Sequence, residues 1–318
     1  MESESGRSEN VISIGLGTMG PGLAVDYLLG GHHVTLVGRN PARLEAARQR
    51  VATTLDFLLQ EEYLTLERRQ SALACLATGL LSDDALLADA TIIVESVAEN
   101  LEVKQDFFAK LEPRCSPETL FLSNTSGLSV SAIFAHLQHP ERALGTHYWN
   151  PPYLMPLVEV TPGQHTGKAS LAKVLDLLEG MGKKPVLVRK ELPGLIWNRL
   201  QFALFRECLH LLQEGVATAE EIDSVVEMGL ARRASATGLF KVADLGGGDV
   251  WYDIASYLFS ELSNAVEPPP VWTEMIERGE FGLKSGQGFY RWQPEQASAI
   301  TAARDRYLLS KLKEQNQG

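Results

Sequence analysis

The stretch VISIGLGTMGPGLA at 11–24 constrains the fold of this chain more than any other. VISI predicts a short buried strand, and the glycines behind it allow a tight turn into a helix. A second strand-like run, HVTLV at 33–37, follows that helix after two glycines. Strand, glycine turn, helix and strand in this order are typical of the first βαβ unit of a doubly wound sheet.

The glycine turn predicts a binding site for the pyrophosphate of a dinucleotide. Its glycines have the spacing G-x-G-x-x-G, which lets the backbone approach the phosphates. The N–H groups and dipole of the next helix favour an anion at its first turn, where Pro21 costs no hydrogen bond. The cofactor-binding residues predicted in this turn are Gly15, Leu16, Gly17, Thr18, Met19 and Gly20.

The end of the second strand bears on which dinucleotide binds. An acid about twenty residues after the glycine turn usually accepts hydrogen bonds from the ribose hydroxyls of NAD. This chain has Gly38, Arg39 and Asn40 instead, with Arg43 one helical turn further. One interpretation is a solvated loop that starts a helix. We favour the other, in which Arg39 meets the 2′-phosphate of NADP(H), and keep NAD(H) as the alternative cofactor.

The middle of the chain alternates strand and helix patterns. One or two amphipathic helices are predicted between 41 and 77, and another at 100–111. Further strands are predicted at 91–96, 119–123, 143–149, 155–160 and 184–189. This alternation predicts an α/β fold with a doubly wound parallel sheet, whose ligands lie beyond the carboxyl ends of the strands. Polar candidates at or just past those ends are Glu95, Glu99, Asn124, Ser126 and His147.

The segment GTHYWNPPYLMPLVEV at 145–160 carries a candidate acid/base pair. Its three prolines predict a rigid bend between two strands, because proline fixes φ and lacks an N–H. Such a bend can bring Glu159 back beside His147. A carboxylate on one imidazole nitrogen leaves the other nitrogen free to exchange a proton with a substrate. A lone His near apolar residues is usually structural, so this hypothesis depends on the cofactor site predicted above.

The pattern becomes helical after Lys190. The run at 192–215 predicts a long apolar helix, and T-A-E-E at 218–221 is a candidate capping box for the next one. A short strand-like end is predicted at 281–292, before a charged terminal helix at 296–315. The apolar surface of the long helix predicts a homodimer.

Four parts are therefore expected along the chain. They are a disordered tail at 1–10, a Rossmann-type NAD(P)-binding domain at 11–190, an all-α dimerisation domain at 191–293 and a C-terminal helix at 294–318.

Composition excludes several functional classes. A formal charge of −11 without a basic stripe argues against a nucleic-acid partner. The polar start and the lack of a long apolar run predict neither a signal peptide nor a membrane span. Three cysteines without a C-x-x-C predict a reduced, cytoplasmic protein without a metal site.

Together these features resemble the 3-hydroxyacyl-CoA dehydrogenase family, over residues 11–293. The ordered motifs that carry the resemblance are GLGTMG (15–20), ESVAENLEVK (95–104), SNTSG (123–127), GTHYWNP (145–151), LVEV (157–160), PGLIWNR (193–199) and GLKSGQGFY (282–290). The resemblance implies a Rossmann-type domain followed by an all-α dimerisation domain. It also implies NAD(P)-dependent interconversion of a 3-hydroxy and a 3-keto group on an acyl thioester or a related carboxylate.

The resemblance also implies roles for single residues. His147 matches the catalytic acid/base of the family and Glu159 the carboxylate that orients it. Ser126 matches the Ser that hydrogen-bonds the substrate oxygen, and Asn198 the Asn that completes the site. Family contacts to the cofactor fall on Glu99, Lys104, Asn150 and Lys284.

Departures from the family motifs leave the substrate open. Gly127 replaces the second Ser of N-T-S-S, and Tyr148-Trp149 is bulkier than the usual aromatic pair. The segment 56–70 is rich in Glu where fatty-acyl members present lysines to CoA. An alternative is therefore a ketoreductase or dehydrogenase of the superfamily, lambda-crystallin-like enzymes included, that acts on a substrate without CoA, such as a cyclic polyketide or an aromatic metabolite. A second alternative is a catalytically idle, crystallin-like protein.

Overall fold

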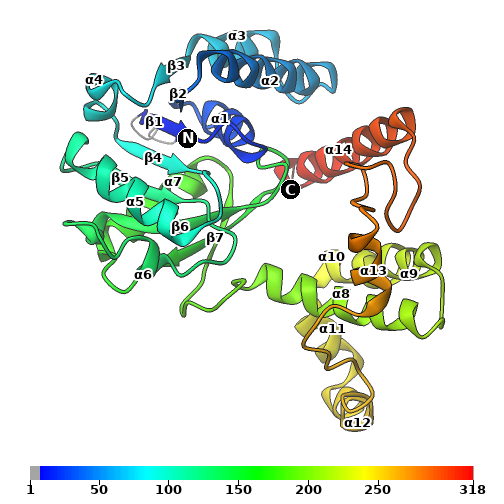
Figure 1. The fold of residues 1–318 in the computed structure, drawn as a ribbon. Coiled ribbons are helices and arrows are strands. Elements are labelled where there is room, and N and C mark those ends of the chain that lie inside the picture. The colour runs from blue at the N-terminus through cyan, green and yellow to red at the C-terminus, as the bar shows by residue number, and fades with distance from the viewer. Residues whose placement is uncertain (1–7, 318) are drawn as a thin grey trace. The chain divides into compact units, whose positions relative to one another are not determined.

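The computed structural model describes residues 8–317 and divides into two compact units (Figure 1). The first unit comprises the chain up to Asn198 together with the stretch from Ala303, and the second comprises Arg199–Ala302. Residues 1–7 of the predicted tail lie outside the described residues. The prediction is wrong for residues 8–10, because the Ser8 hydroxyl donates to the Gly31 carbonyl at 3.1 Å and Asn10 begins a strand.

One eight-stranded sheet organises the first unit. Its spatial order is β3-β2-β1-β4-β5-β6-β7-β8. The strands span β1 Asn10–Ile14, β2 His33–Gly38, β3 Leu76–Leu80, β4 Ile92–Glu95, β5 Leu120–Ser123, β6 Ala143–Tyr148, β7 Leu157–Pro162 and β8 Lys184–Leu187. The order reverses between β1 and β4, as expected for a doubly wound sheet, which confirms the predicted fold class.

Two features of the sheet differ from the prediction. β7 runs antiparallel to β6, because the prolines of the bend return the chain directly beside the strand it left. β3 replaces the end of a predicted helix, since LATGL at 76–80 has no strand alternation and only its pairing with β2 makes it extended. The other pairs of neighbouring strands are parallel.

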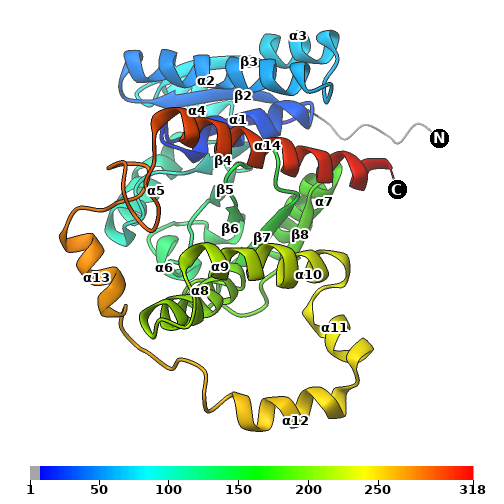
Figure 2. The same cartoon turned by 90° about the vertical axis from the view of Figure 1, so that its right-hand side faces the viewer.

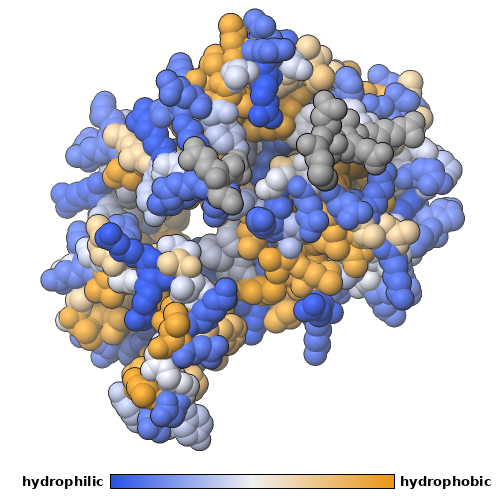
Figure 3. Space-filling view, turned by 180° about the vertical axis from the view of Figure 1, so that it is seen from behind, coloured by the Kyte–Doolittle hydropathy of each residue, from blue (hydrophilic) through white to orange (hydrophobic). Residues whose placement is uncertain are grey.

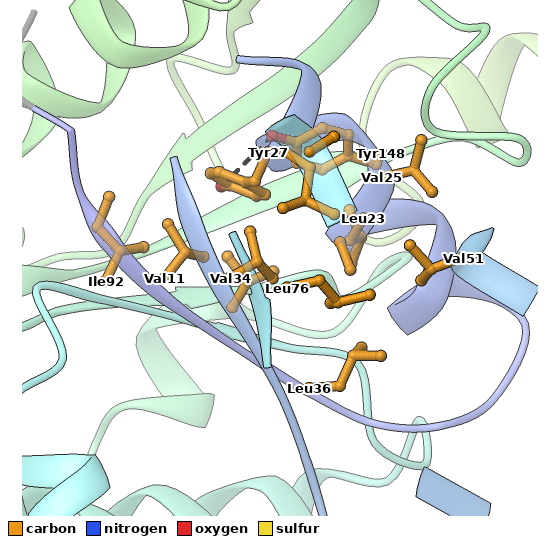
Figure 4. Close-up of a cluster of buried hydrophobic side chains, with 14 of the residues drawn as sticks. Val11, Leu23, Val25, Tyr27, Val34, Leu36, Val51, Leu76, Ile92 and Tyr148 are labelled. Carbon is orange, nitrogen blue, oxygen red and sulfur yellow. Dashed lines mark hydrogen bonds between the residues drawn. The ribbon is translucent and has the colours of Figure 1, made fainter. Parts of the chain in front are cut away.

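Helices cover both faces of the sheet (Figure 2). One core contains buried side chains of α1 Met19–Leu29, α2 Pro41–Gln60, α3 Leu66–Ala74 and α7 Lys168–Gly180. Figure 4 shows part of this core, where Tyr27 of α1 lies beside Tyr148 of β6. The other core contains side chains of α4 Asp84–Ala88, α5 Leu101–Leu111 and α6 Val130–Ile133. Short 3₁₀ turns at Glu112–Arg114 and Pro140–Arg142 join these elements.

The end of the chain packs onto the first core. The predicted terminal helix is confirmed as α14, Pro294–Gln317. Its Leu309 is 2% exposed within the core that α1 and α2 share. Arg306 pairs with Glu61, just after α2, at 2.7 Å.

The second unit is helical, as predicted. It contains α8 Trp197–Gln213 from Arg199 onward, α9 Ala219–Val225, a π-helical turn Val226–Ala231, α10 Arg232–Thr237, α11 Leu239–Gly246, α12 Gly248–Leu258 and α13 Pro270–Glu277. The capping box of α9 is confirmed. The strand-like end at 281–292 is reduced to isolated bridges, such as the one between Gly282 and Gln287. The long helix begins at Trp197 and not at 192, because Gly194 and Leu195 have positive φ values of 79° and 52°.

Large apolar side chains remain exposed in the second unit. Phe240 is 89% exposed and Leu245 is 80% exposed, and exposed aromatic residues follow along α12. Figure 3 shows one face of the molecule on which hydrophobic side chains, in orange, reach the surface. No helix within residues 8–317 combines the length and the hydropathy needed to cross a bilayer.

Candidate active site

The glycine turn between β1 and α1 is tightly packed on one side and open on the other. A Cβ at Gly20 would lie 1.7 Å from the Gly15 carbonyl oxygen, whereas a Cβ at Gly17 would have no heavy atom within 4 Å. Thr18, at the N-terminus of α1, gives no side-chain cap, so the first N–H groups of the helix stay available. Free N–H groups at a helix N-terminus favour an anion, and the pyrophosphate contacts of this turn remain predictions.

A cavity of about 880 Å³ extends from this turn along the ends of β1, β2 and β4. Gly38, Arg39, Asn40 and Arg43 line it beside the glycines. Asn40 caps α2 by accepting a hydrogen bond from the Arg43 N–H, so it starts the helix as well as lining the cavity. The guanidinium groups of Arg39 and Arg43 form no hydrogen bond or ion pair with any residue in 8–317, which leaves them free for a ligand.

Leu16 explains why the second strand ends in a glycine. A Cβ at Gly38 would lie 2.5 Å from Leu16 Cδ1. The Leu16 side chain therefore fills the space next to the backbone where an acidic side chain would begin. The cavity wall at this point is apolar. The charged residues that line the cavity are Arg39 and Arg43, near the end of β2, and Asp106, Lys110 and Arg114.

A buried ion-pair network lies at the ends of β4 and β5. Lys104 Nζ is 2.5 Å from Glu95 Oε1 and 3.4 Å from Glu99 Oε2, and the Lys104 side chain is only 1% exposed. Glu99 accepts hydrogen bonds from the Thr125 hydroxyl at 2.6 Å and the Ser126 N–H at 2.7 Å. The network thus holds the loop that carries Ser126. The predicted cofactor contacts of Glu99 and Lys104 remain predictions.

The structure brings His147 and Glu159 together. They are directly opposite each other on β6 and β7, and His147 Nδ1 is 2.7 Å from Glu159 Oε2. A carboxylate acceptor favours the tautomer that carries the proton on Nδ1, so Nε2 presents its lone pair. Nε2 has no hydrogen-bond partner among the described residues. The bend that returns Glu159 to His147 is therefore confirmed as predicted.

Glu159 is held as a carboxylate. Burial raises its pKa, but hydrogen bonds from His147 and from the Trp197 and Ile196 N–H groups outweigh that effect, so the net pKa lies below its usual value. An ionised Glu159 can orient His147 and stabilise an imidazolium.

The segment 194–198, just before and at the start of α8, lies against this pair. Asn198 donates from its side-chain amide to the Ser126 carbonyl at 2.7 Å. The Trp197 ring stacks on Trp149, with ring centroids 3.8 Å apart. Ser126 is exposed, and its hydroxyl has no partner within residues 8–317, so it can hydrogen-bond a substrate oxygen.

Two predicted cofactor residues have no contact that tests them. Asn150 is exposed directly after β6, in a cis peptide with Pro151. Lys284 is an exposed residue of the second unit. The described residues contain no group of three or more His, Cys, Asp or Glu side chains that could hold a metal ion.

Sequence reasoning missed Arg50. Its guanidinium donates to the carbonyls of Leu16 at 2.6 Å and Gly17 at 3.1 Å, so α2 stabilises the glycine turn. No motif marks this residue, because it meets the turn through a contact 33 residues away in sequence.

The chain is similar to known proteins over nearly its whole length. Residues 10–192 match the NAD binding domain of 3-hydroxyacyl-CoA dehydrogenase, and residues 194–292 match the C-terminal domain of that family. The chain is 33% identical to 5-formyl-3-hydroxy-2-methylpyridine 4-carboxylate 5-dehydrogenase of Mesorhizobium japonicum, over 95% of this chain and 96% of that protein. It is 32% identical to a probable 3-hydroxybutyryl-CoA dehydrogenase of Bacillus subtilis, over 90% and 98% of the two chains.

A solved structure is also similar. It is a crystal structure of 5-formyl-3-hydroxy-2-methylpyridine 4-carboxylic acid 5-dehydrogenase, described as an NAD⁺-dependent dismutase. The TM-score is 0.87 at 31% identity, with 96% of this chain and 98% of that chain covered.

Proposed function

This chain belongs to the 3-hydroxyacyl-CoA dehydrogenase family and is an NAD-dependent dehydrogenase, and on that premise we propose that it interconverts a 3-hydroxy and a 3-keto group on an acyl thioester or a related carboxylate. The observation that carries the proposal is the His147–Glu159 pair at 2.7 Å. β1, β4, β5 and β6 are successive neighbours about 4.8 Å apart, so the pair lies roughly 14 Å along the sheet edge from the glycine turn. An extended dinucleotide can bridge such a distance.

Each site residue has one role in this proposal. In oxidation of the alcohol, His147 Nε2 takes the hydroxyl proton as the C–H bond breaks, and in reduction it returns that proton. Glu159 stabilises the imidazolium and fixes the ring. The Ser126 hydroxyl and the Asn198 amide hold the substrate oxygen and share its developing charge.

The residues present fit NAD as the cofactor. The open side of Gly17, the uncapped first turn of α1 and the adjoining cavity together suit a pyrophosphate and an adenosine. NAD supplies a nicotinamide ring that accepts or returns the hydride. Asn150, Glu99, Lys104 and Lys284 are proposed to contact this cofactor.

Replacing His147 tests the acid/base role. We expect His147→Gln to bind NADH as the wild type does and to lower kcat by roughly 10²–10⁴-fold, because proton transfer loses its positioned base. His136→Gln is a control outside the site. Titration of NADH fluorescence and steady-state assays measure the two effects, and wild-type turnover in His147→Gln would reject the assignment.

A second candidate function is the same reaction on a substrate without CoA. It is favoured by the arginines of segment 56–70, which are already engaged within the protein. Arg69 pairs with Asp56 at 2.5 Å, and Arg68 donates to the Leu29 carbonyl at 3.3 Å. The 33%-identical relative is named for a free pyridine carboxylate. Assays with acetoacetyl-CoA, free 3-hydroxy acids and cyclic ketones separate the candidates by kcat/KM.

We also propose that the cofactor site of this dehydrogenase prefers NADP(H) over NAD(H). The support is the absence of an acid at Gly38 and the two unpaired guanidinium groups of Arg39 and Arg43 beside the cavity. A charge-assisted hydrogen bond to the 2′-phosphate is worth about 1.5–3 kcal/mol. This corresponds to roughly 10- to 100-fold in affinity, and the exposure of Arg39 favours the lower end.

Arg39→Ala decides between the two cofactors. We expect the variant to lose about tenfold in kcat/KM with NADPH and little with NADH. Arg48→Ala, an exposed arginine of α2 that does not line the cavity, is the matched control. A wild type that prefers NADH, or an unchanged ratio in Arg39→Ala, contradicts the NADP proposal and leaves NAD chemistry intact.

A further inference from the structure

Gly127 and Gly194 meet at a backbone contact beside the catalytic pair. A Cβ at Gly127 would lie 2.9 Å from the Gly194 nitrogen and 3.1 Å from its Cα. Both atoms belong to the backbone, so a side chain at 127 could be accommodated only if one chain segment moved. Gly194 has a φ of 79°, a value that residues other than glycine rarely adopt.

The segment that follows Gly194 carries three of the hydrogen bonds that build the site. Ile196 and Trp197 donate from their backbone N–H groups to Glu159 Oε1, at 2.9 Å and 3.0 Å. Asn198 donates to the Ser126 carbonyl, one residue before Gly127. Leu195 keeps a positive φ of 52° although it has a side chain, and that side chain is 3% exposed. The surrounding contacts therefore impose a backbone conformation that Leu195 alone would avoid.

We infer that Gly127 is a positioning residue: its missing side chain lets residues 194–198 close onto the 124–127 loop and the His147–Glu159 pair. Closure sets the distance between Asn198 and Ser126, and it supplies the N–H donors of Glu159. The Trp149–Trp197 stack adds an aromatic contact on the same segment. Gly127 itself needs no contact with substrate or cofactor for this role.

The first test adds one methyl group at the contact. Because displacement of catalytic groups by about 1 Å can cost about 100-fold, we expect Gly127→Ala to lower kcat by roughly 10-fold while the NADH dissociation constant stays unchanged. Gly127→Ser should behave likewise. Gly180→Ala is the matched control, since a Cβ there meets no heavy atom within 4 Å.

A double-mutant cycle distinguishes a displacement of Asn198 from a nonspecific disruption of the fold. If the Ala side chain acts by moving Asn198, Gly127→Ala should cost less in the Asn198→Ala background than in the wild type. Equal factors in both backgrounds overturn the inference. So does a wild-type kcat in Gly127→Ala.

A spectroscopic readout does not depend on turnover. The two stacked indoles, with ring centroids 3.8 Å apart, should give an exciton couplet from their strong transitions in the far-ultraviolet circular dichroism, which Trp197→Phe removes. Gly127→Ala should weaken this couplet and Gly180→Ala should preserve it. The kinetic arm rests on the proposed function, whereas this arm does not, so a protein without turnover still decides the inference by its couplet.

If Gly127→Ala is too unstable to assay, amide hydrogen exchange of the wild-type protein still tests the inference. The Ile196 and Trp197 amides should be protected, because both donate to a carboxylate in the closed segment. Exchange of these two amides at the rate of an unstructured peptide overturns the inference.

Discussion

Glu159 uses both of its carboxylate oxygens within the protein. Oε2 binds His147, and Oε1 accepts from the backbone of Ile196 and Trp197. These donors stabilise the ionised form more than the neutral one, which is why the pKa of Glu159 is lowered in spite of burial. The residue therefore links the stability of the fold to the chemistry of the site.

The lowered pKa of Glu159 predicts a pH dependence of stability. The folded state holds the proton less tightly than the unfolded state, whose carboxyl has the ordinary value near 4.5. The contribution of Glu159 is therefore complete above this value and is lost as the pH falls through the lowered pKa. We expect Glu159→Gln to cost on the order of 1.5–3 kcal/mol at pH 7 and progressively less below pH 4.5.

Urea unfolding of the two proteins at a series of pH values measures this difference. Glu118→Gln, which changes an exposed carboxylate, is the control. A difference between wild type and Glu159→Gln that is independent of pH would show that the carboxylate charge contributes nothing.

Because the Lys104–Glu95 ion pair is buried, removing the charge of Lys104 alone should strongly lower the free energy of unfolding. Removing one member of a buried pair leaves the other uncompensated, so Lys104→Met should cost about 3–5 kcal/mol of unfolding free energy. Adding Glu95→Gln should recover part of it. Lys110→Met is the matched control on the same helix, because that lysine is 79% exposed and its surface pair should contribute less than about 1 kcal/mol. Equal losses in Lys104→Met and Lys110→Met, measured by denaturant unfolding, would contradict this account.

Among the strands and helices, hydrophobic periodicity correctly predicted the elements whose own sequence carries a clear apolar pattern. The buried strands β1, β4 and β5 and the helix α5 lie where apolar runs and helical spacing placed them. In α2 the apolar residues Leu44, Val51, Leu55 and Leu58 recur at the spacing of an amphipathic helix, and all four are buried. Leu66 continues this spacing in the sequence but is 56% exposed, because the chain turns between α2 and α3.

Elements set by distant contacts were not predictable in this way. β3 is a strand only because β2 pairs with it, and the direction of β7 depends on how the proline bend closes. The site follows the same division. Ordered motifs identified the His147–Glu159 pair, whereas the supporting roles of Arg50, Glu95 and Gly127 arise from contacts between segments far apart in sequence.

Although the sequence of α14 is mostly polar, this helix is expected to stabilise the first unit through one buried side chain. Leu309 is 2% exposed in the core of the first unit, so Leu309→Ala should destabilise by about 2–5 kcal/mol through lost burial and a cavity. Ile300→Ala removes a comparable side chain that is 55% exposed on the same helix and should change stability by less than about 0.5 kcal/mol. Denaturant midpoints compare the two, and a mild effect of Leu309→Ala would mean that α14 is dispensable to the core.

For the whole molecule, the exposed apolar side chains of the second unit support the proposal of a homodimer. We propose that the helical domain at 191–293 provides the interface, the Rossmann-type domain at 11–190 binds the cofactor, and the C-terminal helix at 294–318 packs on the latter. Large apolar patches on a monomer usually mark such interaction surfaces.

Phe240→Asp tests the interface. We expect the wild type to sediment as a dimer and Phe240→Asp to shift toward the 34.9 kDa monomer, because burying an unpaired carboxylate opposes association. Leu66→Asp, at an exposed apolar position of the first unit, is the control and should leave the dimer intact. A wild type that stays monomeric at micromolar concentration rules the dimer out.

The first unit is built from two separate stretches of chain, and the second unit lies between these stretches in the sequence. The helical unit is thus an insertion with two covalent attachments, one after Asn198 and one before Ala303. A single protease cut within the exposed stretch at 264–268 should therefore leave the two fragments associated. Each fragment contains a part of the first unit. The buried face of α14 keeps the C-terminal fragment bound to the core of that unit. Complementation follows from this, since two separately expressed fragments divided there carry matching surfaces through which they can reassemble.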